Sequence, residues 1–119
     1  MTLIEELKGL GADVDEALDR VMGDNDLYEM LLGTFLSSLG ENNVSVSDFD
    51  GSDLDGLIKR VHTLKGVTGN LGLTPLFKSY TDILGKLRDN QPKAAKAGYE
   101  QLIPVQEAFT KCIQRHMGM

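Results

Sequence analysis

One histidine, His62, stands out because the residues that follow it leave its ring accessible. Gly66 and Gly69 lie four and seven positions after it, so on a helix they share its strip of surface. Two glycines in a helix interior cost about 1 kcal/mol each relative to alanine. We interpret them as clearance that lets a second protein approach the imidazole.

The same segment carries positive charge in an otherwise acidic protein. Lys59, Arg60 and Lys65 surround His62 in the sequence, whereas the whole chain has a formal net charge of −6. The aliphatic stem of Lys65 can follow apolar surface while its ammonium reaches toward the histidine. A phosphoryl group on His62 is therefore expected to lie in a favourable local field.

This setting suits nucleophilic attack on phosphorus. Neutral imidazole is a nucleophile near physiological pH because the ordinary pKa of histidine is about 6.5. Phosphoryl transfer depends mostly on positioning and charge stabilisation, so a carrier can leave metal ions to its partner. The sequence has no P-loop, glycine-rich nucleotide loop or kinase signature. It predicts a phosphoryl carrier without a cofactor, a metal or an autonomous kinase or hydrolase activity, to which the word enzyme applies only loosely.

The elements that must position His62 are predicted to be helices, because apolar residues recur at helical spacing almost throughout. We expect a short helix from about residue 3, a second over 14–22, a third from 24 that continues with fraying to about 49, a fourth from 52 or 53 to 71, a fifth from 74 or 75 to 87, and a last from about 91 to 113.

Polar residues mark several of the predicted helix starts. Thr2 with Glu5, and Asp13 with Glu16, are typical of N-terminal capping pairs, and Asp24 is a further expected cap. Each such side chain satisfies backbone N–H groups that have no partner inside the helix.

Prolines predict further features of the helices, and the apolar stripe predicts which way His62 faces. Thr74 followed by Pro75 predicts a cap and a first helical residue, and Pro104 is expected to kink the last helix. His62 lies roughly 120° from the centre of the apolar stripe of its own helix, at about 100° per residue, so it should face outward. The residues of that stripe are Leu54, Leu57, Ile58, Val61, Leu64, Thr68 and Leu71.

These elements predict an all-α fold in a single domain over residues 1–119. We expect an antiparallel four-helix bundle over 24–117, preceded by one or two short leading helices within 1–22. The net charge of −6 and an aromatic content of 6% argue against nucleic-acid binding. No apolar run approaches the length of a membrane span, and the expected location is the cytoplasm. A monomer is expected, since a carrier presents its histidine to successive partners.

The sequence assigns no chemical role to Cys112 or His116. Cys112 is the only cysteine, so it forms no internal disulfide, and it is expected to be a small core residue. His116 has no partner at metal-ligand spacing, and two histidines with one cysteine are too few for a usual zinc site.

The run HTLKG at 62–66, followed by NLG at 70–72, resembles the signature of histidine-containing phosphotransfer (HPt) domains of two-component phosphorelays. VDEAL at 14–18 and DLY at 26–28 resemble the leading helices of that family, so the likeness covers about residues 13–116. The poor helix formers at 41–48 and the interior proline depart from the family pattern, but both lie away from the histidine.

The resemblance implies that His62 is the phosphoacceptor, that Lys65 supports its charge and that Gly66 provides clearance. Gly69 falls where the family tends to keep a small residue. The donor and acceptor are then aspartates on response-regulator receiver domains, which bring their own Mg²⁺, and a hybrid sensor histidine kinase is a further implied partner. Transfer is reversible.

A docking surface is also expected around the histidine. Ile58 lies one turn before His62 at the edge of the apolar stripe. The predicted partner-binding residues are Ile58, Lys59, His62, Lys65 and Gly69, with the edge of the leading region over 14–18.

Two other functions remain open from the sequence. The chain is also compatible with the phosphoacceptor domain of a chemotaxis-type histidine kinase, which a separate kinase domain phosphorylates from ATP. A plain helical interaction module without phosphate chemistry is the other alternative, and it gives no specific reason for glycines at 66 and 69.

Overall fold

The structure, a computed structural model, describes residues 1–118 and contains helices but no strand over that range. The all-α prediction is therefore confirmed. The elements in chain order are α1 (Leu3–Gly9), α2 (Val14–Arg20), α3 (Asn25–Glu41), the 3-10 helix η1 (Val46–Asp50), α4 (Leu54–Asn70), α5 (Thr74–Arg88) and α6 (Pro92–His116).

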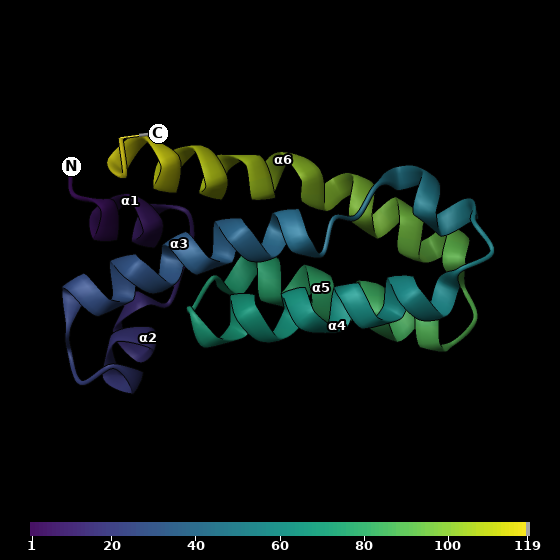
Figure 1. Cartoon of the computed structure of the whole chain (residues 1–119), viewed down its shortest axis with the longest axis horizontal. Helices are drawn as coiled ribbons and strands as arrows, with labels where there is room; N and C mark the ends of the chain where they lie inside the picture. Colours follow the sequence, from purple (N-terminus) through teal and green to yellow (C-terminus); the bar gives the residue numbers. More distant parts are fainter. Residues whose placement is uncertain (119) are drawn as a thin grey trace.

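The molecule is elongated, with extents of 42 × 26 × 23 Å. The helix α5 packs along both α4 and α6, and α3 contacts both of them as well. The short helices α1 and α2 lie at one end, where α1 contacts α6 near the C-terminus of the chain (Figure 1). None of the helices over residues 1–118 is long and apolar enough to cross a bilayer.

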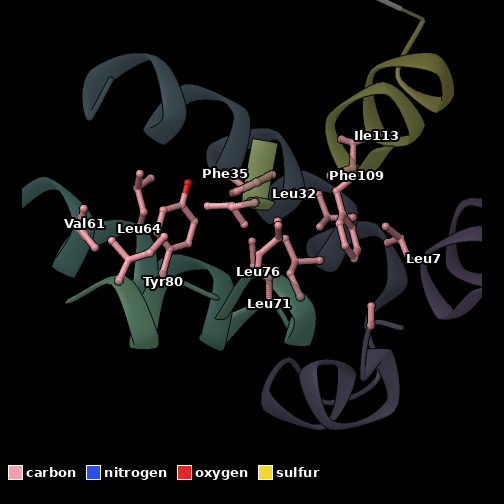
Figure 2. Close-up of a cluster of buried hydrophobic side chains, with 14 of the residues drawn as sticks. Leu7, Leu32, Phe35, Val61, Leu64, Leu71, Leu76, Tyr80, Phe109 and Ile113 are labelled. Carbon is pink, nitrogen blue, oxygen red and sulfur yellow. The ribbon is translucent and has the colours of Figure 1, made fainter. Parts of the chain in front are cut away.

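The core is built from the apolar stripes of these helices (Figure 2). Thr68 is the one buried polar residue in the described chain, and its hydroxyl donates to the Leu64 carbonyl at 2.8 Å. Burial of these side chains provides most of the stabilising free energy. The largest fully buried side chains are Tyr28, Tyr80, Phe35, Phe109, Leu7, Leu32, Leu57, Leu64, Leu73, Leu76, Ile83 and Leu84.

The predicted N-caps are largely present. Thr2 and Glu5 form a reciprocal capping box, and the carboxylates of Asp13 and Asp24 accept backbone N–H groups at the starts of α2 and α3. At α5 the position differs by one residue from the prediction. Thr74 is already helical, and Leu73 precedes it as the cap residue.

The prediction that the third helix continues to about residue 49 is wrong. The helix α3 ends at Glu41, and η1 begins at Val46 after a break. Ser45 explains the new start, since its N–H donates to the carboxylate of Asp48 at 2.9 Å. Polar residues that can bond to nearby backbone offer the chain this alternative to a continued helix.

Pro104 does not interrupt the last helix, since α6 runs from Pro92 to His116 as one element. Pro104 is exposed, and so is Glu100, whose carbonyl loses its usual helical partner when a proline lies four residues later. Water can satisfy such a carbonyl at the surface.

Candidate functional site

Both ends of α4, the helix that carries His62, are satisfied by specific groups. At its start the Asp53 carboxylate accepts the Gly56 N–H at 3.0 Å. At its end the guanidinium of Arg20, from α2, donates to the carbonyls of Gly69 and Asn70 at 3.1 and 2.8 Å. These bonds occupy backbone groups that lack helical partners, and they help to offset the cost of glycine within α4.

The chain turns sharply after α4 at Gly72. Its φ is +70°, and a Cβ there would lie 2.3 Å from the Asp13 carbonyl oxygen. The Asp13 N–H donates to the Gly72 carbonyl at 2.7 Å. Only glycine tolerates both the backbone conformation and the approach of a second backbone. This glycine therefore fixes the segment before α2 against the end of α4.

His62 is exposed on α4, between the buried residues Val61 and Leu64 on either side of it. This is the outward orientation that the apolar stripe predicts. The imidazole forms no hydrogen bond with any residue from 1 to 118, so neither ring nitrogen is occupied by an internal partner.

An open hollow of about 310 Å³ surrounds the histidine, lined by Ile58, Lys59, His62, Thr63 and Arg88. Lys59 precedes His62 by almost one turn, whereas Arg88 is the last residue of α5. Both cations are exposed, and within the described residues neither forms an ion pair. Two cations from two helices, neither in an ion pair within the described residues, therefore line the same hollow as the ring.

Arg88 was not identified from the sequence. It lies far from His62 along the chain, and only the antiparallel packing of α5 on α4 brings the two together. The available signal was the short connection between the two helices. Such a connection predicts antiparallel neighbours, and the C-terminal residues of α5 then lie beside the first half of α4.

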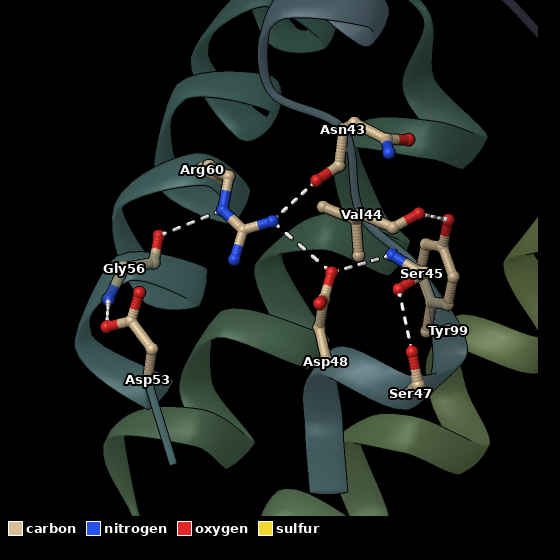
Figure 3. A network of polar contacts seen from close by, with 9 residues as sticks. All are labelled: Asn43, Val44, Ser45, Ser47, Asp48, Asp53, Gly56, Arg60 and Tyr99. Atoms are coloured by element: carbon tan, nitrogen blue, oxygen red, sulfur yellow. Dashed lines mark hydrogen bonds and ion pairs between the residues drawn. The ribbon is translucent and has the colours of Figure 1, made fainter. Parts of the chain in front are cut away.

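Arg60, the other cation expected to charge the His62 surface, has a different role (Figure 3). Its guanidinium donates to the Asn43 carbonyl, and to the carboxylate of Asp48 at 3.2 Å. Two positions along a helix correspond to about 200° of rotation, so Arg60 faces η1 while His62 faces away from it. The interpretation of Arg60 as part of the charged surface around His62 is wrong.

The ion pair of Arg60 belongs to a network that holds η1 in place. The Ser45 N–H, and then the Arg60 guanidinium, keep the pKa of the Asp48 carboxyl below its usual range. The Tyr99 hydroxyl, from α6, donates to the Val44 carbonyl at 2.8 Å in the same region (Figure 3). The polar segment before η1 is therefore fixed by bonds to α4 and α6.

Lys65 is half-buried and does not line the hollow around His62. It lies on α4 three residues after the histidine, and its ammonium has no ion-pair partner among residues 1–118. A contact between this ammonium and a group on His62 stays a prediction.

The two glycines after His62 occupy different environments. A Cβ added to Gly66 would meet no atom within 4 Å, whereas a Cβ on Gly69 would lie 2.8 Å from the ring of Phe77 on α5. The space beside Gly69 is thus filled by the protein itself. Packing of α5 accounts for this glycine, which corrects its interpretation as clearance for a partner. Of the two glycines, only Gly66 has room for a Cβ.

A second open groove, of about 500 Å³, lies beside these glycines. Gly66 and Gly69 line it together with Glu16, from the leading helix α2, and Lys78 from α5. The structure therefore brings part of the expected 14–18 region next to the glycines, while Ile58 and Lys59 lie at the His62 hollow.

No protein-family model, curated protein or solved structure matches this chain. The chemistry of the site therefore has to be inferred from its own side chains.

Proposed function

We propose that this protein is a phosphoryl carrier of the HPt type, which accepts a phosphoryl group on His62 from the aspartyl phosphate of a receiver domain and passes it to another receiver. The observation that carries the proposal is the His62 hollow. An exposed, unbonded imidazole lines it together with Lys59 and Arg88, two cations without an ion-pair partner in the described chain.

The transfer needs little from the carrier. A ring nitrogen of neutral His62 attacks phosphorus, the bond between phosphorus and the aspartyl oxygen breaks, and its electron pair returns to the aspartate carboxylate. The ring, which carries a positive charge after the attack, passes the proton on its other nitrogen to water, and this leaves a neutral ring that bears the anionic phosphoryl group. The cationic side chains of Lys59 and Arg88 stabilise the negative charge of the phosphoryl oxygens, and Mg²⁺ is supplied by the receiver.

Charge–phosphate contacts also explain why arginine at the end of α5 suits the site. The planar guanidinium presents several N–H donors and matches phosphate oxygens in a fixed geometry. Arg88 and Lys59 come from different helices, so they approach the phosphoryl group from two directions. Lys65 is the third expected cation; it lies on α4 but does not line the hollow.

The proposed scaffold is an antiparallel four-helix bundle of α3, α4, α5 and α6. Its support is a closed ring of contacts, in which α3 packs on α4, α4 on α5, α5 on α6 and α6 on α3. Short connections favour antiparallel neighbours. In this arrangement α1 and α2 are leading helices that cover one end.

The proposed docking surface combines the His62 hollow with the open surface at Gly66. Ile58 supplies the apolar part, Lys59 the cationic part, and Gly66 a surface without a side chain. We propose that the protein is cytoplasmic and acts as a monomer, because it can then bind receivers and a hybrid sensor kinase one after another.

The test is to incubate the protein with a receiver domain phosphorylated in the presence of Mg²⁺. We expect acid-labile, base-stable label on the wild-type protein and none on His62→Gln. The matched control is His116→Gln, which removes the other histidine and should keep the label. Label that persists in His62→Gln would overturn the proposal.

Arg88 offers a second, graded test of the same site. A hydrogen bond to a charged group contributes about 1.5–3 kcal/mol, so Arg88→Ala should slow transfer by roughly tenfold or more. Arg88→Lys should recover part of the rate. Transfer at the wild-type rate in Arg88→Ala would remove this arginine from the site.

The donor distinguishes the alternative functions. Label from ATP and a separate kinase catalytic domain, with none from a phosphorylated receiver, would identify the phosphoacceptor domain of a chemotaxis-type kinase. Absence of label from either donor would leave the helical interaction module.

A further inference from the structure

Three potential metal-binding side chains converge where the first helix meets the end of the last. Glu6 of α1 lies beside Cys112 and His116 of α6, and one ligand atom of each falls within 4.8 Å of the others. Cys112 Sγ lies 3.2 Å and His116 Nε2 lies 2.8 Å from Glu6 Oε2. The sequence separates Glu6 from the other two by more than a hundred residues, so only the fold assembles this cluster.

We propose that Glu6, Cys112 and His116 form a three-ligand site for a divalent transition metal, zinc by the chemistry of its donors, which links α1 to the end of α6. The site lies on elements other than α4 and α5 and does not depend on the function proposed for His62.

The donor set matches zinc in type and number. Zinc binds cysteine sulfur, histidine nitrogen and carboxylate oxygen, and three protein ligands with an exchangeable fourth position form one of its common arrangements. Cys112 and His116 are four residues apart on one helix, which places them on the same face. A mixed thiolate and imidazole set disfavours Mg²⁺ and Ca²⁺, which prefer oxygen ligands.

The two distances to Glu6 Oε2 are close to what the ion needs, and Cys112 Sγ and His116 Nε2 lie within 4.8 Å of each other. Ligands of tetrahedral zinc lie about 3.3–3.6 Å apart when metal–ligand bonds are about 2.0–2.3 Å long. The sulfur–oxygen distance of 3.2 Å is almost at that value, and the nitrogen–oxygen distance of 2.8 Å has to open slightly. The His116 side chain is 25% exposed and lies near the end of α6, so a small rotation of its ring can make this adjustment.

One competing cation has to leave. The Arg115 guanidinium donates to Glu6 Oε2 at 2.6 Å, but its side chain is 65% exposed and can return to water. An open hollow of about 220 Å³ beside Glu6 and Cys112 provides a route for the ion. Metal coordination would replace the hydrogen bonds that now meet at this single oxygen.

Binding should release a proton from the cysteine. Metal ions bind cysteine as the thiolate, so the Cys112 thiol has to lose its proton when the ion binds. The metal ion takes the sulfur lone pair, the S–H bond breaks, and one proton from the thiol passes to water for each ion bound.

The test is a titration of EDTA-dialysed, reduced protein with Co²⁺, followed by displacement with Zn²⁺. We expect a sulfur-to-cobalt charge-transfer band that saturates at one ion per chain, and proton release in weakly buffered solution. Zinc at one hundred times its Kd should raise Tm by about 10 °C. A wild-type protein without the band or the Tm shift would overturn the proposal and leave a purely hydrogen-bonded cluster.

Variants decide whether all three residues are ligands. Cys112→Ser should abolish the band, and His116→Gln and Glu6→Gln should each weaken cobalt binding at least tenfold. His62→Gln is the matched histidine control and should bind as tightly as wild type. Unchanged affinity in both Glu6→Gln and His116→Gln would show a thiol that binds metal nonspecifically, which contradicts the site. Far-UV circular dichroism checks that each variant is folded, and Glu6→Asp replaces Glu6→Gln if the latter is not.

Discussion

Replacement of Gly66 by alanine should separate what stabilises the protein from what its function requires. Gly66 lies in the interior of α4, and an added Cβ would meet no atom within 4 Å. Alanine is favoured over glycine by about 0.8–1.0 kcal/mol in a helix interior. With no clash to offset this gain, Gly66→Ala should raise the free energy of unfolding by about 1 kcal/mol, which corresponds to a Tm increase of about 3–5 °C.

The same methyl group should impair phosphoryl transfer. Gly66 lies one turn after His62 on the proposed docking surface, and a close-fitting partner has no room for an added side chain. Overpacking costs about 1–3 kcal/mol. At a subsaturating receiver concentration, this cost corresponds to a transfer rate that is lower by roughly fivefold or more. The assay is label transfer from a phosphorylated receiver, paired with thermal unfolding by far-UV circular dichroism.

Gly33→Ala provides the matched control. Gly33 lies in the interior of α3, and its added Cβ would make ordinary contact with Met117 at 3.8 Å. It should gain similar stability and transfer at the wild-type rate. A stabilised Gly66→Ala that also transfers at the wild-type rate would refute the clearance interpretation, and a destabilised one would refute the geometry on which it rests.

Three further predictions follow from the packing and the charges. Gly69→Ala forces a Cβ against the Phe77 ring at 2.8 Å, so chemical denaturation should show it to be less stable than Gly66→Ala by about 1–3 kcal/mol. Tyr28→Phe leaves the Leu71 carbonyl without its 2.7 Å hydrogen bond and should lower the unfolding free energy by about 1–3 kcal/mol in the same experiment. A ΔΔG near zero would contradict either prediction. Hydrogen bonds, the Cys112 thiol's first, lower the pKa of Glu6 from 4.5 to about 2. The ionised Glu6 carboxylate therefore makes its full contribution to the free energy of unfolding above about pH 4.5, and this contribution is lost as the pH falls toward 2. Over that interval the free energy of unfolding should fall less in Glu6→Gln than in the wild type.

Local features of this protein were determined by the sequence alone. The apolar stripes predicted helices throughout, and residues such as Thr2, Asp13 and Asp24 marked where three of them begin. The exposure of His62 followed from its angle to the stripe of its own helix. These features depend on residues a few positions apart, for which helical geometry is known in advance. The break after Glu41 was missed because the bonds that hold the next segment come from Arg60 and Tyr99, which are distant in the chain.

The neighbours of His62 were decided by the tertiary structure. Arg88 reaches the hollow because α5 packs antiparallel to α4, and Gly69 is accounted for by the Phe77 ring that this packing brings against it. Arg60 carries the charge expected of a phosphate-binding residue, but it lies on the side of α4 that faces η1, where it pairs with Asp48. The type of His62 and the spacing of the glycines after it were enough to single it out as the candidate phosphoacceptor, since both are local properties of the sequence. The cations and the clearance around it depend on contacts between helices, which only the folded chain brings together.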